Sequence, residues 1–409
     1  MPSYALRFVN AHYAPDVAAT GEFLTDLAEG LTARGHRVHV VTGRLPYGAR
    51  AASVPDEEVR NGVRVTRVRT TQGGRSGTLR RLSDYATFFL GAAGPVLSGA
   101  PADLTVYLTT PPLLGLLGLA QGALGRGRYG LWVMDLHPEA EIAHGMIPPH
   151  GTATRFLGAL DRRVFAGSSL TAVLGRCMAE RVADKVPGQP PRVLPLWRDG
   201  GEVRPRPREE NPLARRWDVD DRFVLMYSGN AGLAHRFEEI KELLRHFRDD
   251  DGVLTLFIGS GPRRRELEAF LSAEGIRNAR YLDYLPREEV PWSLPLADVH
   301  LLSLEPAWKG IAVPSKVFGI MAAGRPGVMV GPAGAEPARI LEEAGAGVVV
   351  DPEGVRTPSR RLIDIVEELR ADTGLREHMG QRGRKVLLQR FSLEAGLDRW
   401  EAALHDVLG

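Results

Sequence analysis

Short apolar runs alternate with amphipathic stretches along most of the chain. Residues 6–9 and 38–41 are runs of strand length, and apolar side chains between them, over residues 24–31, repeat at the 3.6-residue spacing of a helix. Gly35 ends that helix. A strand, a helix and a second strand within about forty residues form the repeating unit of a parallel, doubly wound sheet. The pattern therefore predicts an α/β fold.

The alternation continues into the C-terminal third and predicts two further sets of strands. The first set is expected at residues 63–68, 104–108, 129–133, 171–174 and 192–194, and the second at residues 223–227, 253–258, 299–302, 327–330 and 348–350. Residues 195–221, between the sets, are rich in Pro, Arg and Gly and show no periodicity. Because 409 residues suit two domains, we interpret this stretch as the connection between domains plus an entry loop.

The most apolar run, residues 111–124, is shorter than a bilayer span and is interrupted by Gly115, Gly118 and Gln121. It predicts a buried helix. The N-terminus leads into the first strand without the basic and apolar regions of a signal peptide, so none is expected. Cys177 is the only cysteine, which excludes an internal disulfide framework and fits a reducing cytosol.

Composition narrows the classes of partner. A hydrophobic content of 44% and a charged content of 25% are typical of globular proteins, and a net charge of +2 gives no reason to expect nucleic acid. The sequence pI of about 8.7 permits contact with an anionic membrane surface. One stretch places arginines before aromatic residues: Arg75, Arg80, Arg81, Tyr85, Phe88 and Phe89. Such a face could lie on a membrane, and the alternative is a packed helix with solvated arginines.

Candidate functional residues in the first half follow predicted strands, because ligands bind at the carboxyl ends of strands in such sheets. The loop after the first strand carries His12, Tyr13 and a single glycine, Gly21, where the dinucleotide fingerprint needs three glycines. The strand at 129–133 runs into Asp135, His137 and Glu139, and His144 lies in the loop beyond it. Three ionisable side chains at a strand end suit proton or acceptor chemistry. The alternative is that Asp135 caps a backbone turn.

Glycines dominate the strand ends of the second half. The strand at 223–227 leads into Gly229, Asn230 and Gly232, which let a backbone approach a ligand closely, and Arg236 then opens a helix where it could reach a phosphate. A plain glycine-rich turn is the alternative. The next strand ends in Gly259 and Gly261, followed by three arginines, residues 263–265, most of which we expect to be solvated.

Residues 313–326 predict a short helix with an anion site at its start. Pro314 suits the first helical position, and Val313 offers no side-chain cap, so the N–H groups of Ser315, Lys316 and Val317 lack a local partner. Free N–H groups, the helix dipole and the Lys316 ammonium group attract an anion. Gly324 suits the end of the helix. The alternative is an ordinary buried helix with a solvated lysine.

No metal site is expected. Two aspartate runs, residues 218–221 and 249–251, lie just before predicted strands and thus at their amino ends, so we interpret both as turns. No Cys/His cluster suits zinc, and no Walker lysine or G-x-S-x-G motif occurs. We therefore expect no cofactor.

The helix start at 314–316 resembles the donor-binding segment of retaining glycosyltransferases of family 4, above all those that build bacterial capsules, exopolysaccharides and O-antigens. The loops at 227–232 and 259–262, the first loop at 10–21 and the segment 27–43 resemble that family too. The resemblance implies the GT-B fold, two Rossmann-like doubly wound domains facing across a cleft. Residues 1–195 would bind the acceptor and residues 196–385 the nucleotide-sugar donor, with a C-terminal helix, 386–409, packing back on the first domain.

The resemblance also implies roles for the candidate residues. Lys316 and Arg236 would neutralise the leaving diphosphate, and Asp135 or His137 would touch the acceptor hydroxyl. The remaining donor-binding candidates are Gly229, Asn230, Gly232, Gly259, Gly261, Tyr284, Leu285, Lys309, Gly310, Ser315 and Val317, and the acceptor-binding ones are His12, Tyr13, Gly21, Glu139 and His144. Configuration would be retained by same-face attack, with the departing phosphate taking the proton of the acceptor.

One feature departs from the family. Its members commonly carry two glutamates seven residues apart, but Ile311 and Gly319 occupy those positions here, and the nearby Glu305 has the wrong spacing. The ribose must then be bound differently. Two other functions therefore stay open: a nucleotide-sugar 2-epimerase of the same fold, and a non-catalytic nucleotide-sugar-binding partner subunit.

The nucleotide and the acceptor follow only from the resemblance. UDP is expected because it is the most frequent nucleotide in the family. The acceptor would be a glycan, a small molecule or a lipid-linked sugar at the inner face of the plasma membrane, which places the protein in the cytoplasm with peripheral membrane contact.

Overall fold

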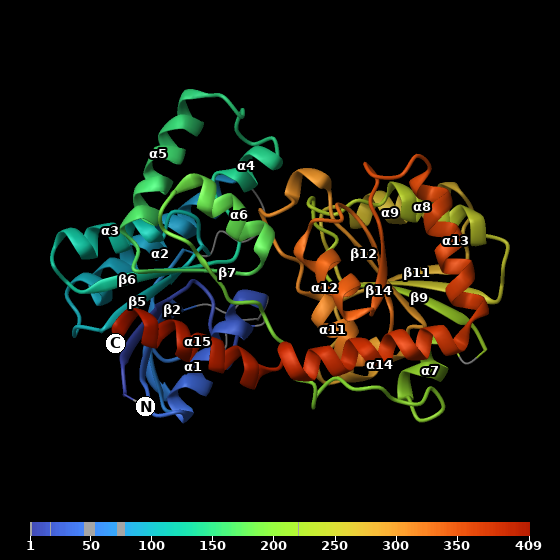
Figure 1. The fold of residues 1–409 in the computed structure, drawn as a ribbon, viewed down its shortest axis with the longest axis horizontal. Helices are drawn as coiled ribbons and strands as arrows, with labels where there is room; N and C mark the ends of the chain where they lie inside the picture. Colours follow the sequence, from blue (N-terminus) through green and yellow to red (C-terminus); the bar gives the residue numbers. More distant parts are fainter. Residues whose placement is uncertain (1, 17, 45–53, 72–77, 220) are drawn as a thin grey trace. The chain divides into compact units, whose positions relative to one another are not determined.

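The computed structural model describes residues 2–16, 18–44, 54–71, 78–219 and 221–409. The chain divides into two compact units (Figure 1). Unit 1 contains residues 1–195, 310–312 and 393–409, and unit 2 contains residues 196–309 and 313–392. The C-terminal passage between units was expected near residue 385. It occurs after residue 392 because the preceding helix, α14, runs to Arg390 within unit 2.

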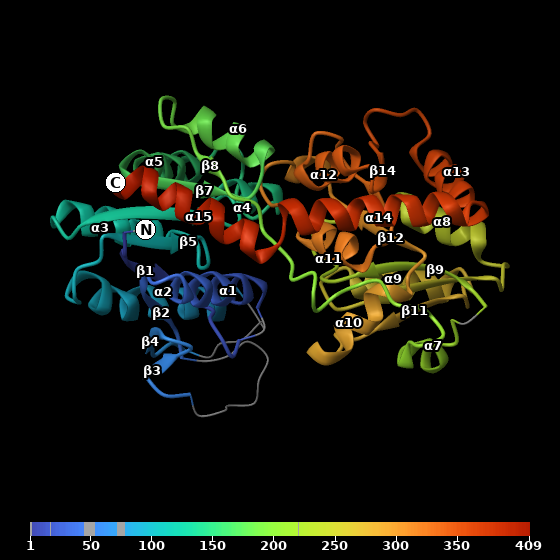
Figure 2. The ribbon, with the colours of Figure 1, turned by 60° about the horizontal axis from the view of Figure 1, so that its bottom comes forward.

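Unit 1 is built on an eight-stranded sheet. Its strands are β1 (Ala5–Val9), β2 (Arg37–Gly43), β3 (Glu57–Arg60), β4 (Val63–Val68), β5 (Leu104–Leu108), β6 (Arg128–Val133), β7 (Leu170–Val173) and β8 (Arg192–Val193). Their order is β3-β4-β2-β1-β5-β6-β7-β8, parallel except for the β3–β4 hairpin at one edge (Figure 2). In the middle of the sheet Phe8 lies opposite Val40 on one side and Val106 on the other.

The helices of unit 1 are α1 (Ala19–Ala33), α2 (Thr78–Leu97), α3 (Gly115–Ala123), α4 (Glu139–Ala143), α5 (Thr152–Gly167), α6 (Arg176–Lys185) and α15 (Leu393–Leu408). The predicted buried helix is α3, which packs between α2 and α5. A side chain at Gly118 would meet the ring of Tyr129 on β6, and the buried Gln121 accepts a hydrogen bond from Tyr107. The residues that interrupt this apolar run are therefore its packing surface against the sheet.

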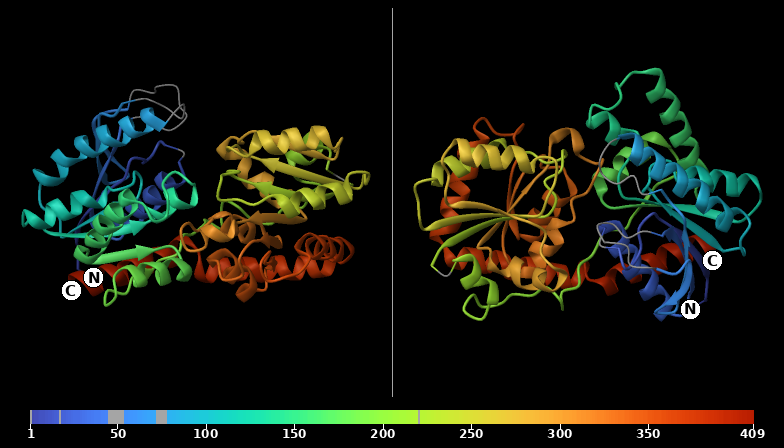
Figure 3. Two further views of the ribbon diagram at one scale, coloured as in Figure 1. Left: turned by 90° about the horizontal axis from the view of Figure 1, so that it is seen from above. Right: turned by 180° about the vertical axis from the view of Figure 1, so that it is seen from behind.

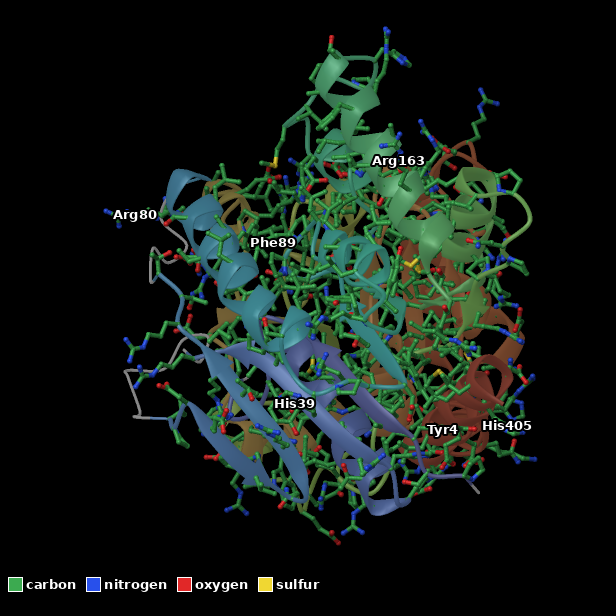
Figure 4. All side chains as sticks on the ribbon, turned by 90° about the vertical axis from the view of Figure 1, so that its left-hand side faces the viewer. Tyr4, His39, Arg80, Phe89, Arg163 and His405 are labelled. Atoms are coloured by element: carbon green, nitrogen blue, oxygen red, sulfur yellow. The ribbon has the colours of Figure 1, made fainter. Side chains whose placement is uncertain are left out.

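The C-terminal helix α15 belongs to unit 1 and packs on α1. Trp400 is fully buried against the rings of Phe8 and Trp132. Arg34, at the end of α1, donates hydrogen bonds to three carboxylates of α15, those of Glu394, Asp398 and Glu401. Near the end of the helix, Tyr4 and His405 lie side by side, their side chains 3.1 Å apart (Figure 4).

Unit 2 is built on a six-stranded, wholly parallel sheet in the order β11-β10-β9-β12-β13-β14. The strands are β9 (Phe223–Ser228), β10 (Val253–Ile258), β11 (Ala279–Leu282), β12 (Val299–Ser303), β13 (Gly327–Val330) and β14 (Gly347–Val350). β10, β12 and β13 are buried along their whole length, as continuous apolar runs in a parallel sheet require.

Helices cover both faces of this sheet (Figure 3). They are α7 (Pro212–Trp217), α8 (Glu238–Phe247), α9 (Arg264–Ala273), α10 (Val290–Ser293), α11 (Lys316–Ala323), α12 (Glu336–Ala344), α13 (Pro358–Ala371) and α14 (Thr373–Arg390), with 3₁₀ turns at Arg287–Glu289, Leu294–Leu296 and Pro306–Trp308. Within the part of the chain that the structure describes, no helix is both long enough and apolar enough to cross a membrane.

Candidate functional site

Two glycine loops follow β9 and β10, at the carboxyl edge of the sheet of unit 2, and are bonded to each other. The N–H of Gly229 donates to the carbonyl of Ile258 at 2.8 Å, and that of Ala231 to the carbonyl of Ser260 at 2.7 Å. Gly229, Gly259 and Gly261 have φ angles of 123°, 131° and 140°, which side chains rarely adopt. A side chain at Gly259 would also collide with the carbonyl of Gly229.

Other predicted members of these loops lie close by. Asn230 is exposed, whereas Gly232 is buried, and a Cβ added to it would lie 3.0 Å from the amide nitrogen of Asn230. Tyr284, after β11, is 55% exposed, and its ring approaches Gly259, while Leu285 is half-buried. An exposed aromatic ring beside a glycine offers a flat surface on which a base can stack.

Lys316 is the first residue of α11, with Ser315 as its cap residue; the Ser315 side chain makes no capping bond. The helix thus starts two residues later than predicted from Pro314, while the predicted end at Gly324 is confirmed by its left-handed φ of 65°. Val317 is fully buried, so only its backbone could meet a ligand.

The Lys316 side chain extends to the first glycine loop. Its Nζ lies 2.6 Å from Oη of Tyr227, 3.0 Å from the carbonyl oxygen of Asn230 and 3.2 Å from Nε2 of His235. It also sits 4.1 Å from the centroid of the Tyr227 ring. An added Cβ at Gly229 would lie 2.7 Å from Cε of the lysine, so the glycine makes room for it.

The ammonium group of Lys316 has no carboxylate partner among the described residues, and burial lowers its pKa to about 7. Removing a cation from water without giving it an anionic neighbour raises the free energy of the folded state. An incoming phosphate would supply the missing negative charge.

His235 was not predicted, although it lies in the motif between Gly232 and Arg236. It is buried, and its Nδ1 lies 2.6 Å from the carbonyl oxygen of Ser303. Burial, followed by the charge of Lys316, lowers the pKa of His235 to about 3. Nothing in the sequence indicated that this side chain would turn inward onto the lysine.

Arg236 is not placed as the sequence suggested. Its Nε and one terminal nitrogen donate to both oxygens of the buried Glu239 at 2.7 and 2.6 Å, and its other nitrogen lies 3.7 Å from Glu305. Hydrogen bonding to Glu239 raises the pKa of Arg236. The guanidinium is thus neutralised within unit 2, a pairing that the sequence analysis did not include.

The three arginines at 263–265 also differ from the prediction that most are solvated. Arg263 is half-buried, 3.4 Å from Glu305 and 3.6 Å from Glu238. Arg264 pairs with Glu268 and Asp283, and Arg265 alone of the three is exposed. Glu268 is four residues from Arg264, a spacing that the sequence shows, whereas Glu238, Glu305 and Asp283 lie further away in the sequence and could not be found from local spacing.

The loop before α11 is divided between the units. Lys309, half-buried in unit 2, has its ammonium group beside Gly334. Gly310 belongs to unit 1, where its φ is 74° and a side chain would collide with the carbonyl of Cys177. Packing within unit 1 thus favours glycine at position 310. The sequence had suggested only a contact with donor hydroxyls.

Gly319 occupies the position of the absent second glutamate. An added Cβ at Gly319 would lie 3.2 Å from Cδ1 of Leu294, a buried residue of the 3₁₀ turn Leu294–Leu296. A side chain at this position would therefore require the leucine side chain to shift by a few tenths of an ångström.

In unit 1, a group of ionisable residues follows β6. Nδ1 of His137 lies 2.7 Å from a carboxylate oxygen of Glu141, a residue that sequence analysis did not single out. Burial lowers the pKa of His137, but the hydrogen bond and charge of Glu141 outweigh it, so that the pKa is raised overall. Burial raises the pKa of Asp135. The charge of the exposed His144 acts to lower the pKa values of Asp135 and Glu141. Asp135 and His137 are thus close enough for their charges to interact, and His144 lies within electrostatic range of Asp135 and Glu141.

The backbone of this group is fixed within unit 1. The hydroxyl of Thr109 accepts hydrogen bonds from the N–H groups of Met134 and Asp135. The N–H of Leu136 donates to the carbonyl of Ile311 at 2.9 Å, beside a β-bridge between Asp135 and Ala312. Asp135 does not cap a turn through its carboxylate in any of these bonds, so its side chain stays available.

Glu139 has a different role from the one predicted. Its carboxylate lies 2.8 Å from Nζ of Lys185, which also binds Asp161 at 2.6 Å. Burial raises the pKa of Asp161 to about 6. The expected acceptor contact of Glu139 is therefore replaced by an ion-pair cluster that ties α4, α5 and α6 together.

The loop after β1 meets the prediction only in part. His12 is half-buried, with Nδ1 2.6 Å from a carboxylate oxygen of Asp16. Tyr13 is 3% exposed and lies among charged residues of unit 1, so its predicted place at a binding surface is wrong. At Gly21, α1 packs against this loop. A Cβ added there would lie 3.1 Å from the Cβ of His12.

Two further expectations depend on residues that are only partly described. Asp220 and Arg75 lie outside the described residues. Asp218 ends α7 in the left-handed region with a φ of 55°, and Asp250 accepts a hydrogen bond from Gly252 at 2.9 Å, so both act in turns. In the described ranges no group of three or more His, Cys, Asp or Glu is arranged to hold a metal ion.

The chain is similar to known proteins along most of its length. Residues 19–197 match the family described as glycosyl transferase 4-like domain. The chain is 29% identical over 310 residues, 75% of each chain, to the probable glycosyltransferase WbjE of Pseudomonas aeruginosa. It is 23% identical over 368 residues, 84% of this chain and 88% of the relative, to the putative colanic acid biosynthesis glycosyl transferase WcaI of Escherichia coli K12.

A solved structure shares the fold. Anabaena HepE, in a complex with UDP and glucose, superimposes with a TM-score of 0.73 over 98% of this chain and 100% of that chain, at 15% identity. The likeness extends over both units, each of which is a parallel sheet covered by helices.

Proposed function

Since the chain is a glycosyltransferase of the family-4 type with the GT-B fold, we propose that it transfers a sugar from a UDP-sugar to a hydroxyl group of its acceptor. The proposed reaction retains the configuration of the sugar and needs no metal ion. The acceptor is a glycan or a lipid-linked sugar of a polysaccharide pathway.

The observation that carries this proposal is the state of Lys316. Arg236 and Arg263, on the same edge of the sheet of unit 2, are neutralised by glutamates, whereas Lys316 has neutral hydrogen-bond acceptors and no carboxylate among the described residues. The glycine loop at 229–232 lies against it. A diphosphate would complete this site, because a buried cation favours an anionic partner.

In the proposed mechanism, Lys316 and the N–H groups at the start of α11 stabilise the charge that grows on the β-phosphate as the glycosidic bond breaks. The departing phosphate oxygen accepts the proton of the acceptor hydroxyl as that oxygen attacks the anomeric carbon from the same face. Asp135 and His137 of unit 1 hold the acceptor hydroxyl. Tyr284 stacks on the base of the nucleotide.

The comparisons support the nature of the substrates. A solved neighbour is named as a complex with UDP and glucose, and a relative is named for colanic acid biosynthesis. Both bear on this chain by similarity only. The proposed UDP-sugar and polysaccharide acceptor are therefore the first to test.

We expect UDP to stabilise the protein in a thermal-shift assay more than GDP, ADP or dTDP, with EDTA making no difference. A ligand at 100 times its Kd contributes about 2.7 kcal/mol, which is readily measured. Lys316→Met should abolish the shift because it removes the cation, whereas Lys385→Met, at an exposed lysine, should not. A shift that survives in Lys316→Met, or that requires a divalent metal, would contradict the proposal.

Turnover distinguishes the alternatives. A transferase releases UDP in proportion to the acceptor consumed, a 2-epimerase converts the nucleotide-sugar without an acceptor, and a binding subunit does neither. Assays of the purified chain with UDP-sugars, with and without membrane lipid extract as a source of acceptor, separate these three outcomes.

We also propose that unit 1 contacts an anionic membrane surface through α2 and α5. On α2, Leu82 and Leu90 are 55% and 71% exposed and lie eight residues apart on one face with the exposed Ala86 between them. On α5, Phe156 is 62% exposed, beside the exposed arginines at positions 155, 162 and 163. An uncharged helix face next to arginines suits the interface of an anionic bilayer.

Co-sedimentation with vesicles tests this contact. We expect the protein to sediment with vesicles that contain phosphatidylglycerol but not with pure phosphatidylcholine. Leu90→Glu combined with Phe156→Glu should release it, because each change places a negative charge in the contact. Val59→Glu is the matched control, since Val59 is 73% exposed but lies on β3. Equal loss in the control would mean that the proposed surface is wrong.

A further inference from the structure

All three hydrogens of the Lys316 ammonium group are already in use. They point to Oη of Tyr227 at 2.6 Å, the carbonyl oxygen of Asn230 at 3.0 Å and Nε2 of His235 at 3.2 Å. An anionic ligand can therefore bind the ammonium group only by replacing one of these acceptors. The question is which of the three can give way.

Two of the acceptors are fixed by the fold. Tyr227 is fully buried on β9, with its hydroxyl 3.3 Å from the carbonyl oxygen of Asn230. Asn230 precedes Ala231, whose N–H is bonded to Ser260 at 2.7 Å in the neighbouring glycine loop. Withdrawing either acceptor would move a strand or a pair of bonded loops. His235 makes the longest of the three contacts, and it is a side chain on a loop.

The protonation of His235 follows from its second contact. Because Nδ1 lies 2.6 Å from the carbonyl oxygen of Ser303, which can only accept, Nδ1 carries the proton. Nε2 then has a lone pair that faces the ammonium group. The His235 ring also meets the Tyr227 ring edge-on at 5.9 Å, which fixes its plane.

We propose that His235 is a positioning residue for Lys316. Its Nε2 accepts the third ammonium hydrogen, holds the side chain at the strand edge, and yields that hydrogen to an oxygen of the anionic donor. No covalent step is involved. This inference deepens the proposed function and rests on the role given there to Lys316.

The proposal makes the charge of Lys316 depend on His235. A hydrogen bond to the charged form of a group raises its pKa, so loss of the Nε2 acceptor should lower the pKa of Lys316 further below its usual range. A hydrogen bond to a charged group contributes about 1.5–3 kcal/mol, which corresponds to a shift of about one to two pKa units.

The other ionisable groups around the lysine do not change charge near neutral pH. Tyr227 has its pKa raised by burial well above its usual range, and burial raises that of Tyr281 to about 12. Tyr284 also faces Tyr227. Arg263 is a permanent cation that faces both Tyr227 and His235.

The test is an NMR titration of the full-length protein, which has five lysines. With ¹³Cε-labelled lysine, the resonance missing from Lys316→Arg identifies Lys316, and its shift against pH gives its pKa. We expect a midpoint near 7 in the wild type, a midpoint lower by about one unit or more in His235→Phe, and a value near the wild type in His235→Gln, whose amide oxygen can accept.

His300→Phe is the matched control. His300 is buried and also bonds a carbonyl oxygen, that of Leu294, but it makes no contact with Lys316. A purely structural effect of losing a buried histidine would appear in both variants. If His235→Phe titrates at the wild-type midpoint, or if His300→Phe shifts equally, the proposal is wrong.

A second measurement needs no variant, in case His235→Phe does not fold. In ¹⁵N-histidine-labelled wild-type protein, Nε2 of His235 should be unprotonated throughout and should change its shift when UDP displaces the lysine hydrogen. An Nε2 that carries the proton contradicts the proposal. The His235 variants can behave as expected while UDP leaves the titration midpoint of Lys316 unchanged. That result would support His235 as a positioning residue and contradict the proposed function.

Discussion

Gly229 meets two requirements at once, and both concern Lys316. Its φ of 123° lies where residues with a side chain are strained, and an added Cβ would lie 2.7 Å from Cε of the lysine. The glycine is therefore needed for the loop and for the position of the cation. Few other positions in the chain couple backbone conformation so directly to a candidate binding group.

We predict that Gly229→Ala raises the Kd for UDP more than tenfold. It should also lower the free energy of unfolding by about 1–3 kcal/mol. Gly188→Ala is the control, because Gly188 has a φ of 93° with open space around it and so reports the backbone strain alone. Isothermal calorimetry and urea unfolding measure both quantities. Equal UDP affinity in the two variants would show that the space for Lys316 is unimportant.

At the scale of elements, the last helix is part of the first unit rather than an appendage of the second. The α15 face that carries Trp400 completes the core beside Phe8 and Trp132, and Arg34 of α1 binds its carboxylates. A helix of 16 residues gains most of its stability from such packing. Unit 1 therefore depends on a segment that follows unit 2 in the sequence.

We predict that Trp400→Ala destabilises unit 1 by about 3–5 kcal/mol, as expected for a buried aromatic side chain. Hydrogen exchange followed by mass spectrometry should show faster exchange in β1, β5 and β6 but not in the strands of unit 2. Arg192→Ala removes an exposed ion pair with Asp406 of the same helix and should cost less than about 1 kcal/mol. Uniform loss of protection across both units would contradict this assignment of α15.

At the scale of the whole molecule, neither unit is a continuous stretch of chain. The chain passes from unit 1 to unit 2 after residue 195 and returns after residue 392, and residues 310–312 belong to unit 1 although the loops on either side belong to unit 2. Residues 310–312, which include the Ile311 carbonyl that accepts a hydrogen bond from the N–H of Leu136, are thus continuous in the chain with Lys316 of unit 2.

The sequence by itself determined the class of fold and nearly all strands. Buried parallel strands are continuous apolar runs, so β4, β5, β10 and β13 were predicted to the residue. The two missed strands, β3 and β11, lie at sheet edges, where burial is partial and the pattern is weak. Asn61-Gly62, with φ angles of 48° and 84°, is a hairpin turn signal that could have revealed β3.

Only the tertiary structure decided which charged residues are available to a ligand. Arg236 and Glu139 have the same chemistry in the sequence as Lys316 and Asp135, yet Arg236 is neutralised by Glu239, three residues further along the chain, and Glu139 by Lys185 on another helix. The first pairing has a local spacing, whereas the second depends on a distance between helices that no local spacing encodes. Residue types and strand ends could therefore be predicted from the sequence, while the lack of a carboxylate beside Lys316 among the described residues, and the contact of Lys316 with His235, follow only from how the loops of unit 2 pack.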